Sequence, residues 1–320
     1  MPPKRPRFGS LQFWPRKRAQ KFLPRVNWDV ISNSKNVSST EGNGLLGAIV
    51  YKVGMISASV KDETANSMTK GKKIVVPATV LEVPPMGVYS VRFYNKGIPV
   101  KDVVVSTDKE LKRYVKVAKS PKTLDSEVPA EYDNIHLLVY SKVSKIGLKK
   151  TPDMIEVGIK GDDKLALEKQ YVSRDITIKD VLNTGLFDAR GLTKGKGLVG
   201  PVKRFGLTLK GHKSEKGVRR PGSLAPWHPA RVTFRTPMAG QMGMFTRIQR
   251  NLKTLFVGNI SENNVNPKAG FSNYGLVSGD YILVQGSVPG PQKRQLVLST
   301  SSRPTKKLAV RKFTFLEVAQ

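Results

Sequence analysis

The sequence predicts a mainly β protein that carries an α/β insertion, so α+β overall. Short apolar segments recur at a spacing of about ten residues with turn residues between them, which is typical of a β-barrel or a β-sandwich. A block with mixed helical and strand patterns separates two groups of these segments. Apolar residues make up 39% of the 320 residues, enough to bury a sizeable core.

The first β group follows an N-terminal segment rich in Pro, Lys and Arg with interleaved aromatic residues, which is predicted to be extended. The glycine-punctuated apolar run "LLGAIVYKVGMISASV" begins the folded part. Strands are predicted over 45–60, 73–83, 87–95 and 99–106.

The middle block is predicted to contain both helices and strands. A helix is expected over 108–119, because Leu111, Tyr114 and Val115 share one stripe and Asp108 is a suitable N-cap. Two strands, 135–143 and 153–161, and a second helix, 162–172, follow.

The β pattern then returns with strands at 274–288 and 293–302, joined by the turn "VPGPQ". The predicted organisation is a basic N-terminal extension (1–44), a first part of the β domain (45–107), an α/β insertion (108–175), a strand (176–190), a basic central extension (191–249), and a second β part with a basic C-terminal segment (250–320).

The charge is segregated along the chain. Lys and Arg number 55 against 24 Asp and Glu, a net of +31. Residues 1–25 hold eight basic and no acidic residues, 190–250 hold fourteen against Glu215 alone, and 293–312 hold seven and none. Residues 51–189 hold 23 basic and 18 acidic residues. Single-sign blocks of this kind indicate polyanion binding, with nucleic acid the first candidate and an anionic membrane the second.

Sequence patterns give little support to an enzyme or a metalloprotein. The chain has no cysteine, and its three histidines have no metal-ligand spacing, so we expect no metal, no cofactor and no small-molecule substrate. "GKGLVG" (195–200) matches the letters of a dinucleotide motif, but Pro201 follows it and no strand–helix context surrounds it. No apolar run is long enough to span a bilayer and no signal peptide is evident, so a cytosolic protein is expected.

The stretch "SLAPWHPARVTFRTPMAGQMG" (223–243) has no regular periodicity and is surrounded by positive charge. Aromatic and guanidinium planes stack on unpaired bases, and basic side chains contact phosphates, so RNA contact is favoured. The alternative is that Trp227 anchors this segment to the protein's own core. An RNA-modifying enzyme that uses the segment as a clamp, and a polycation on an anionic membrane, are the remaining alternatives; neither has its expected cofactor motif or basic amphipathic helix.

Six ordered blocks resemble the universal L-three family of large-subunit ribosomal proteins, in its archaeal and eukaryotic branch. The blocks are "FGSLQFWPRKRA" (8–19), "LLGAIVYKVGM" (45–55), "TKGKGLVGPVKRFG" (193–206), "APWHPARV" (225–232), "MAGQMG" (238–243) and "GSVPGPQKR" (286–294). The resemblance implies a non-enzymatic, rRNA-binding component of the large ribosomal subunit that acts early in assembly beside other ribosomal proteins. It also implies a split six-stranded barrel of the translation-protein type, with long basic extensions into RNA and a central loop, bearing Trp227, near the peptidyl-transferase centre.

Residues of the basic segments are the candidates for rRNA contact. They are Arg16, Lys17, Arg18, Lys194, Lys196, Lys203, Arg204, Lys216, Arg219, Arg220, Trp227, His228, Arg231, Arg235, Gln241, Arg247, Lys293 and Arg294.

Overall fold

The computed structural model describes residues 13–40, 42–121, 123–124, 126–161, 163–214 and 216–319. Residues 1–12 of the predicted arm therefore lie outside the described residues. The chain divides into two units. One contains the residues up to Phe22 together with Leu192–Arg247, and the other contains Leu23–Gly191 and Ile248–Gln320.

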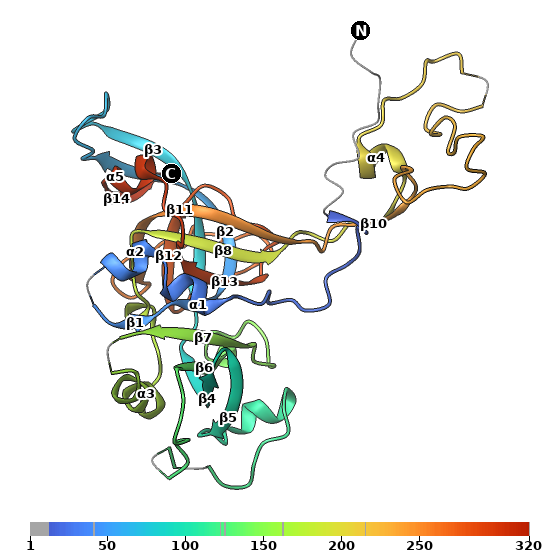
Figure 1. The fold of residues 1–320 in the computed structure, drawn as a ribbon. Helices are drawn as coiled ribbons and strands as arrows, with labels where there is room; N and C mark the ends of the chain where they lie inside the picture. The colour runs from blue at the N-terminus through green and yellow to red at the C-terminus, as the bar shows by residue number, and fades with distance from the viewer. Residues whose placement is uncertain are drawn as a thin grey trace. The chain divides into compact units, whose positions relative to one another are not determined.

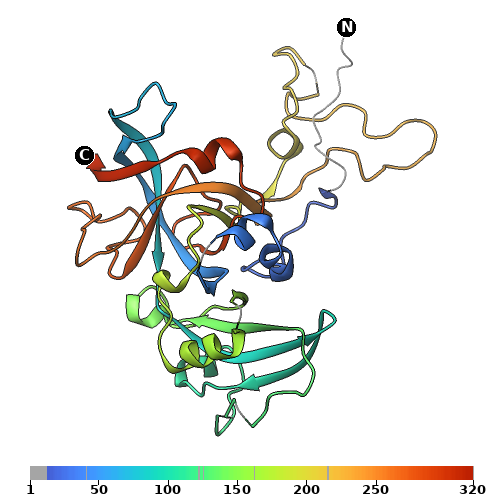
Figure 2. The same cartoon turned by 60° about the vertical axis from the view of Figure 1, so that its left-hand side comes forward.

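Strands are the dominant secondary structure of the larger unit (Figures 1 and 2). Its seven-stranded sheet has the order β13-β8-β11-β12-β3-β2-β14, and β13 also pairs with β2. The strands are β2 (Gly47–Asp62), β3 (Lys73–Val83), β8 (Leu186–Leu192), β11 (Thr246–Asn259), β12 (Asp280–Gln285), β13 (Gln295–Thr300) and β14 (Phe313–Ala319).

A second, five-stranded sheet has the order β1-β7-β6-β4-β5. Its strands are β1 (Gly44–Leu45), β4 (Met86–Asn95), β5 (Ile98–Val104), β6 (Asn134–Ser141) and β7 (Met154–Lys160). Because β4 pairs with β6 from Met86 to Tyr94, the predicted boundary at 107 does not coincide with the sheet boundary. The two strands before that boundary, β4 and β5, belong with the insertion instead.

The two sheets share a core. One continuous cluster of buried apolar side chains includes Ile49 and Leu298 of the seven-stranded sheet and Leu137 and Val157 of the five-stranded sheet. At the junction, the buried Tyr51 hydroxyl donates to Asp153 and also hydrogen-bonds to the Ser141 hydroxyl (2.9 Å). The seven-stranded and five-stranded sheets are therefore joined by a shared apolar core and by hydrogen bonds of Tyr51.

The predicted N-terminal extension ends earlier than residue 44. Two short helices, α1 (Trp28–Ser32) and α2 (Lys35–Ser39), bury Trp28, Ile31 and Val37 in the core. The Trp28 indole N–H donates to the Glu156 carbonyl at 2.6 Å. Helices of only five residues gain their stability from tertiary packing, which local sequence does not reveal.

The helix predicted over 108–119 is wrong in length and type. The structure has only a 3₁₀ helix, Lys109–Arg113, and Asp108 makes no side-chain cap. The Asp108 carboxylate instead accepts a hydrogen bond from the Tyr140 hydroxyl. The other predicted helix is confirmed as α3 (Lys164–Ser173), capped by the Asp163 side chain, which accepts from the Ala166 N–H. Asp162, predicted as part of this helix start, lies outside the described residues.

The strand predicted over 274–288 is shorter than expected. Residues 274–279 precede β12 as an irregular segment because the buried Glu82 carboxylate accepts the N–H groups of Ser278 and Gly279 at 2.9 and 3.2 Å. The Tyr274 hydroxyl donates to the same carboxylate. A carboxylate that binds this backbone competes with a continued β ladder.

The C-terminal basic block is not an extended arm. Between 293 and 312 the chain forms β13, whose residues from Leu296 to Thr300 are buried, and the short helix α5 (Lys306–Val310).

Candidate nucleic-acid interface

The smaller unit is organised by a short antiparallel ladder. Strand β9 (Gly197–Val199) pairs with β10 (Gly240–Met242), with Gln241 opposite Leu198. Two further backbone hydrogen bonds extend the ladder. The Lys196 N–H donates to the Met242 carbonyl at 2.9 Å, and the Thr193 N–H donates to the Phe245 carbonyl at 3.0 Å. The central segment thus leaves and returns at adjacent points, with forty residues between β9 and β10.

A cluster of aromatic and arginine side chains joins the N-terminal segment to the central segment. Phe205, at the end of helix α4 (Pro201–Phe205), is buried and stacks on Trp14 with ring centroids 5.5 Å apart. The Arg16 guanidinium lies 4.5 Å from the Phe205 centroid and 5.5 Å from that of Trp14. Phe234 meets Trp14 edge-on at 6.1 Å. Stacking and cation–π contacts therefore hold the two chain segments together where little apolar core exists.

Arg204 is the hydrogen-bonding centre of this unit. Its guanidinium donates to the carbonyls of Gln241 (3.1 Å), Met238 (3.0 Å) and Arg16 (3.2 Å). Arg16 in turn donates to the Arg204 carbonyl at 2.9 Å. Burial and the neighbouring Arg16 charge lower the pKa of Arg204, and burial and Arg247 lower that of Arg16. Arg204 and Arg16 thus brace the fold of the segment, a role that the charge pattern alone did not indicate.

Two glycines of the MAGQMG block are needed by the chain's own packing. A Cβ at Gly240 would lie 2.6 Å from the Arg204 Nη1 atom. Gly243 is buried with φ of +81°, and a Cβ there would lie 2.1 Å from the Lys194 carbonyl oxygen. The structure therefore places protein atoms directly against both glycines.

Gly243→Ala is therefore expected to loosen the β9–β10 ladder. The added methyl group would collide with the Lys194 backbone. The positive φ of Gly243 also disfavours any L side chain, and this backbone strain costs about 1–3 kcal/mol. Hydrogen exchange of the Lys196 amide should accelerate by at least about tenfold. Gly222→Ala is the matched control because Gly222 has open space around its Cα, and equal exchange rates in the two variants would contradict this role for Gly243.

The remaining candidates of this unit form an exposed, single-sign surface. Neither the described residues 13–22 nor those from 192 to 247 include an Asp or Glu, so none of these cations has an acidic partner within that part of the unit. The exposed basic candidates are Lys17, Arg18, Lys194, Lys196, Lys203, Lys216, Arg219, Arg220, Arg231, Arg235 and Arg247. We call these eleven residues the basic surface.

Trp227 projects into solvent. Its side chain is 88% exposed, and its only ring contact among the described residues is edge-on with His228, at 6.5 Å. The possibility that Trp227 anchors the segment to the protein's own core is therefore wrong. Gln241 is half-buried and its amide donates to the carbonyls of Met242 and Gly243 at 3.2 and 3.3 Å.

Lys293 and Arg294 lie in the other unit, in the turn before β13. Lys293 adopts a left-handed conformation with φ of 64°, and its N–H donates to the Lys52 carbonyl at 2.8 Å. The Arg294 carbonyl accepts from the Lys52 N–H at 3.0 Å, and burial lowers the pKa of the Arg294 guanidinium.

The described part of the chain contains no group of three or more acidic or histidine side chains placed to hold a metal ion. No helix among the described residues is both long enough and apolar enough to cross a bilayer.

Comparison with known proteins identifies the family. The family model described as ribosomal protein L3 matches residues 1–316. The chain is 39% identical to the large ribosomal subunit protein uL3 of Methanobrevibacter smithii, over 94% of this chain and 93% of the relative. It is 38% identical to uL3 of Methanococcoides burtonii (93% and 92%) and 35% identical to uL3 of Methanocaldococcus jannaschii (95% and 93%). The chain with this basic, two-segment unit belongs to the ribosomal protein L3 family.

Proposed function

We propose that this chain is a structural, non-enzymatic component of the large ribosomal subunit that binds large-subunit rRNA in the cytoplasm. The observation that carries the proposal is the basic surface, whose exposed cations have no acid beside them in the described part of their unit. Family membership and the printed names of the archaeal relatives support the assignment to the large subunit.

RNA binding follows from the electrostatics of this surface. Cations that repel one another in the free protein gain stability when phosphates lie between them, and the counterions released from RNA add to the affinity. The Arg16–Arg204 framework keeps the backbone of the segment ordered, so fewer degrees of freedom are lost on binding. The N-terminal and central segments thus act as one RNA-binding element.

The larger unit has a different proposed role. Strand β13 pairs with both β8 and β2, a pattern that fits a split six-stranded barrel of the translation-protein type. We infer that this unit contacts neighbouring large-subunit proteins.

Two further proposals concern the whole protein and its smaller unit. We infer that the protein joins the large subunit early in assembly, and that the loop bearing Trp227 extends toward the peptidyl-transferase centre.

Salt-dependent RNA binding tests the proposal. Each neutralised phosphate contributes about −0.7 to −0.9 to the slope of log K against log salt concentration. We expect a slope steeper than about −4 for binding to large-subunit rRNA, since about half of the basic surface suffices for that. Lys216, Arg219 and Arg220, changed together to alanine, should make the slope shallower by about 2 to 3.

The matched control changes Lys109, Lys112 and Lys116 to alanine, which removes three exposed charges from the larger unit. It is expected to change the slope less than the first triple variant does. A slope that corresponds to only one or two contacts for the native chain would overturn the proposal.

Trp227→Ala should separate function from stability. The indole is almost fully exposed, so the melting temperature of the free protein should change by less than about 2 °C. Trp28→Ala is the control of the same residue type; this side chain is 3% exposed, and its loss should lower the melting temperature by about 10 °C. Subunits with Trp227→Ala should assemble yet bind tRNA or peptidyl-transferase inhibitors differently, and unaltered binding of both would refute a role for the indole there.

A further inference from the structure

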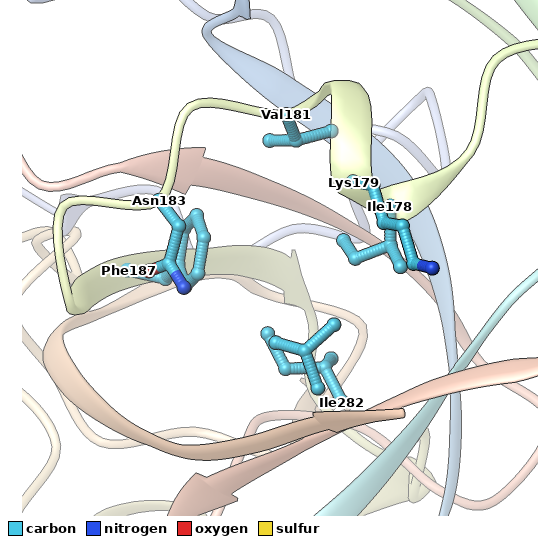
Figure 3. Close-up of a pocket in the computed structure, with 7 residues that line it drawn as sticks. Ile178, Lys179, Val181, Asn183, Phe187 and Ile282 are labelled. Atoms are coloured by element: carbon cyan, nitrogen blue, oxygen red, sulfur yellow. The ribbon is translucent and has the colours of Figure 1, made fainter. Parts of the chain in front are cut away.

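A pocket of about 310 Å³ in the larger unit has an apolar interior (Figure 3). Its walls include the buried side chains of Ile178, Val181, Phe187 and Ile282. Lys179 is the one charged side chain among its described lining residues. A single cation binds a polyanion only weakly, and the larger unit concentrates its positive charge at a different place.

That place is the end of the β2–β3 hairpin. Residues 61–73 and 303–312 together contain nine Lys and Arg residues and two acids. Strand β14, which follows the second of these segments, pairs with β2 and so brings the two segments together (Figure 1). The Lys312 N–H donates to the Thr64 hydroxyl at 3.1 Å, although the two residues are 248 positions apart in the chain. Tertiary structure therefore joins two basic segments that are remote in the sequence.

Five exposed lysines form what we call the hairpin surface: Lys61, Lys70, Lys72, Lys73 and Lys312. Lys61 and Lys73 are direct partners in the β2–β3 ladder, and like charges directly opposite each other destabilise a sheet. Glu317 pairs with Lys73 at 2.5 Å, whereas no ion pair of the other four lysines occurs among the described residues. An external anion would relieve the repulsion that remains in the free protein.

The acid that lies next to Lys61 in the chain is turned inward. The Asp62 side chain is buried, and its carboxylate accepts the hydroxyls of Ser67 and Thr69 at 2.6 and 2.5 Å. The Thr64 N–H donates to the same carboxylate at 2.9 Å. These hydrogen bonds fix the turn that carries two of the lysines, so the cations are presented on an ordered loop. Glu63 is exposed and is the one acid of residues 61–73 that faces solvent.

We propose that the hairpin surface binds the phosphate backbone of a second RNA segment, separate from the segment bound by the basic surface. The inference rests on the proposed rRNA-binding function, and it makes the protein a bridge between two RNA segments. The two surfaces belong to different units of the chain. Lysine ammonium groups act as point charges that neutralise phosphates whatever the base sequence is.

The composition of the hairpin favours RNA over an acidic protein as the partner. Residues 61–73 contain no aromatic side chain, although aromatic residues are enriched at the centres of protein interfaces. Base stacking also uses aromatic side chains, so contact here is expected with phosphates and not with unpaired bases. The preferred ligand is therefore an RNA duplex of any sequence.

Methionine-methyl NMR on the full-length chain reports on the two surfaces separately. Met68, 98% exposed in the hairpin turn, is the probe of the hairpin surface, and Met238, 48% exposed, is the probe of the basic surface. The buried Met86 is the internal reference. The ligand is a short RNA duplex of mixed sequence. Both exposed signals are expected to shift, with Met238 saturating first because the basic surface has more cations, and Met68 following with a separate, weaker affinity.

Changing Lys61, Lys70 and Lys72 together to glutamine is the most direct test. At about 0.1 M salt the affinity reported by Met68 should fall by at least about tenfold, and its salt slope should become shallower by about 2 to 3. The Met238 curve should stay as in the native chain. Energy transfer between donor-labelled and acceptor-labelled copies of the duplex measures bridging, and it should fall with the Met68 response.

The matched control changes Lys109, Lys112 and Lys116 to glutamine. It removes the same charge from exposed positions of the same unit, away from the hairpin in sequence. The Met68 response and the energy transfer should both stay close to those of the native chain. An equal loss in the control and in the hairpin variant would mean that only the total charge of the unit matters, which contradicts a defined hairpin surface.

Three further results would overturn the inference. A Met68 signal that stays unmoved while Met238 saturates would remove the second surface and leave the proposed rRNA binding intact, whereas no response of either signal would contradict both. Identical curves for Met68 and Met238 without energy transfer would mean one continuous RNA site. A Met68 response that is tighter for polyglutamate than for the duplex would make the hairpin surface a docking site for an acidic protein.

Discussion

Removal of residues 194–244 is expected to leave the larger unit folded while abolishing most of the RNA affinity. The Thr193 N–H donates to the Phe245 carbonyl at 3.0 Å, so a Gly-Gly linker can join these two residues as a tight hairpin turn. The deleted segment contains eleven Lys and Arg residues and one acid, Glu215. Affinity for rRNA at 50 mM salt should fall by at least about a hundredfold.

The folded state should survive because the cores lie elsewhere. The two clusters of buried apolar side chains are built from residues of the larger unit, and neither includes a residue of the deleted segment. Circular dichroism is expected to show a cooperative thermal melt close to that of the native chain. A chain that melts without cooperativity would mean that the central segment is required for the core, and native-like RNA affinity would mean that the basic surface is not the RNA-binding element.

Local sequence predicts the bounds of a strand or helix well where the residues within that element carry a clear hydrophobic pattern. The strand predicted over 73–83 has the bounds of β3, and the predicted helix 162–172 coincides closely with α3. The failures occur where a distant side chain determines the backbone. Asp108 is engaged by Tyr140 instead of capping a helix, and Glu82 holds the N–H groups of residues 278 and 279. Neither pairing can be read from a window of neighbouring residues.

The candidate site shows the same limit. Charge segregation located the basic surface, because formal charge is a property of the sequence itself. The cluster of Trp14, Arg16 and Phe205 was missed, since its members are about 190 positions apart in the chain. The only signal was the combination of aromatic and basic letters in both segments, and that pattern fits RNA contact equally well.

Glu168→Gln is expected to stabilise the free protein at neutral and alkaline pH. Glu168 lies on α3 with no exposed surface, and neither carboxylate oxygen has a hydrogen-bond partner among the described residues. Burial raises its pKa to about 9, only partly opposed by the charge of Lys164. A carboxyl group in this position is protonated in the folded protein at pH 7, while its unfolded counterpart, with a pKa near 4.5, is ionised.

The direction of the pH effect follows from proton binding. Between pH 4.5 and about 9 the folded chain holds a proton at Glu168 that the unfolded chain has lost, so the free energy of unfolding falls as pH rises through this window. Each unit of displaced pKa corresponds to about 1.4 kcal/mol, so by pH 9 the total exceeds the effect of a typical point substitution. Glutamine removes the titration and keeps the shape of the neutral side chain.

The two proteins should therefore differ least near pH 4 and most near pH 9, where Glu168→Gln melts at a clearly higher temperature. All other titrating groups are common to both chains, so the difference between their melting temperatures isolates Glu168. Glu63→Gln, at an exposed position, is the control and should show no such divergence with pH. Parallel melting curves for Glu168→Gln and the native chain from pH 4 to pH 9 would mean that Glu168 is solvated or paired in the folded protein, and that α3 packs against β4 without a buried neutral acid.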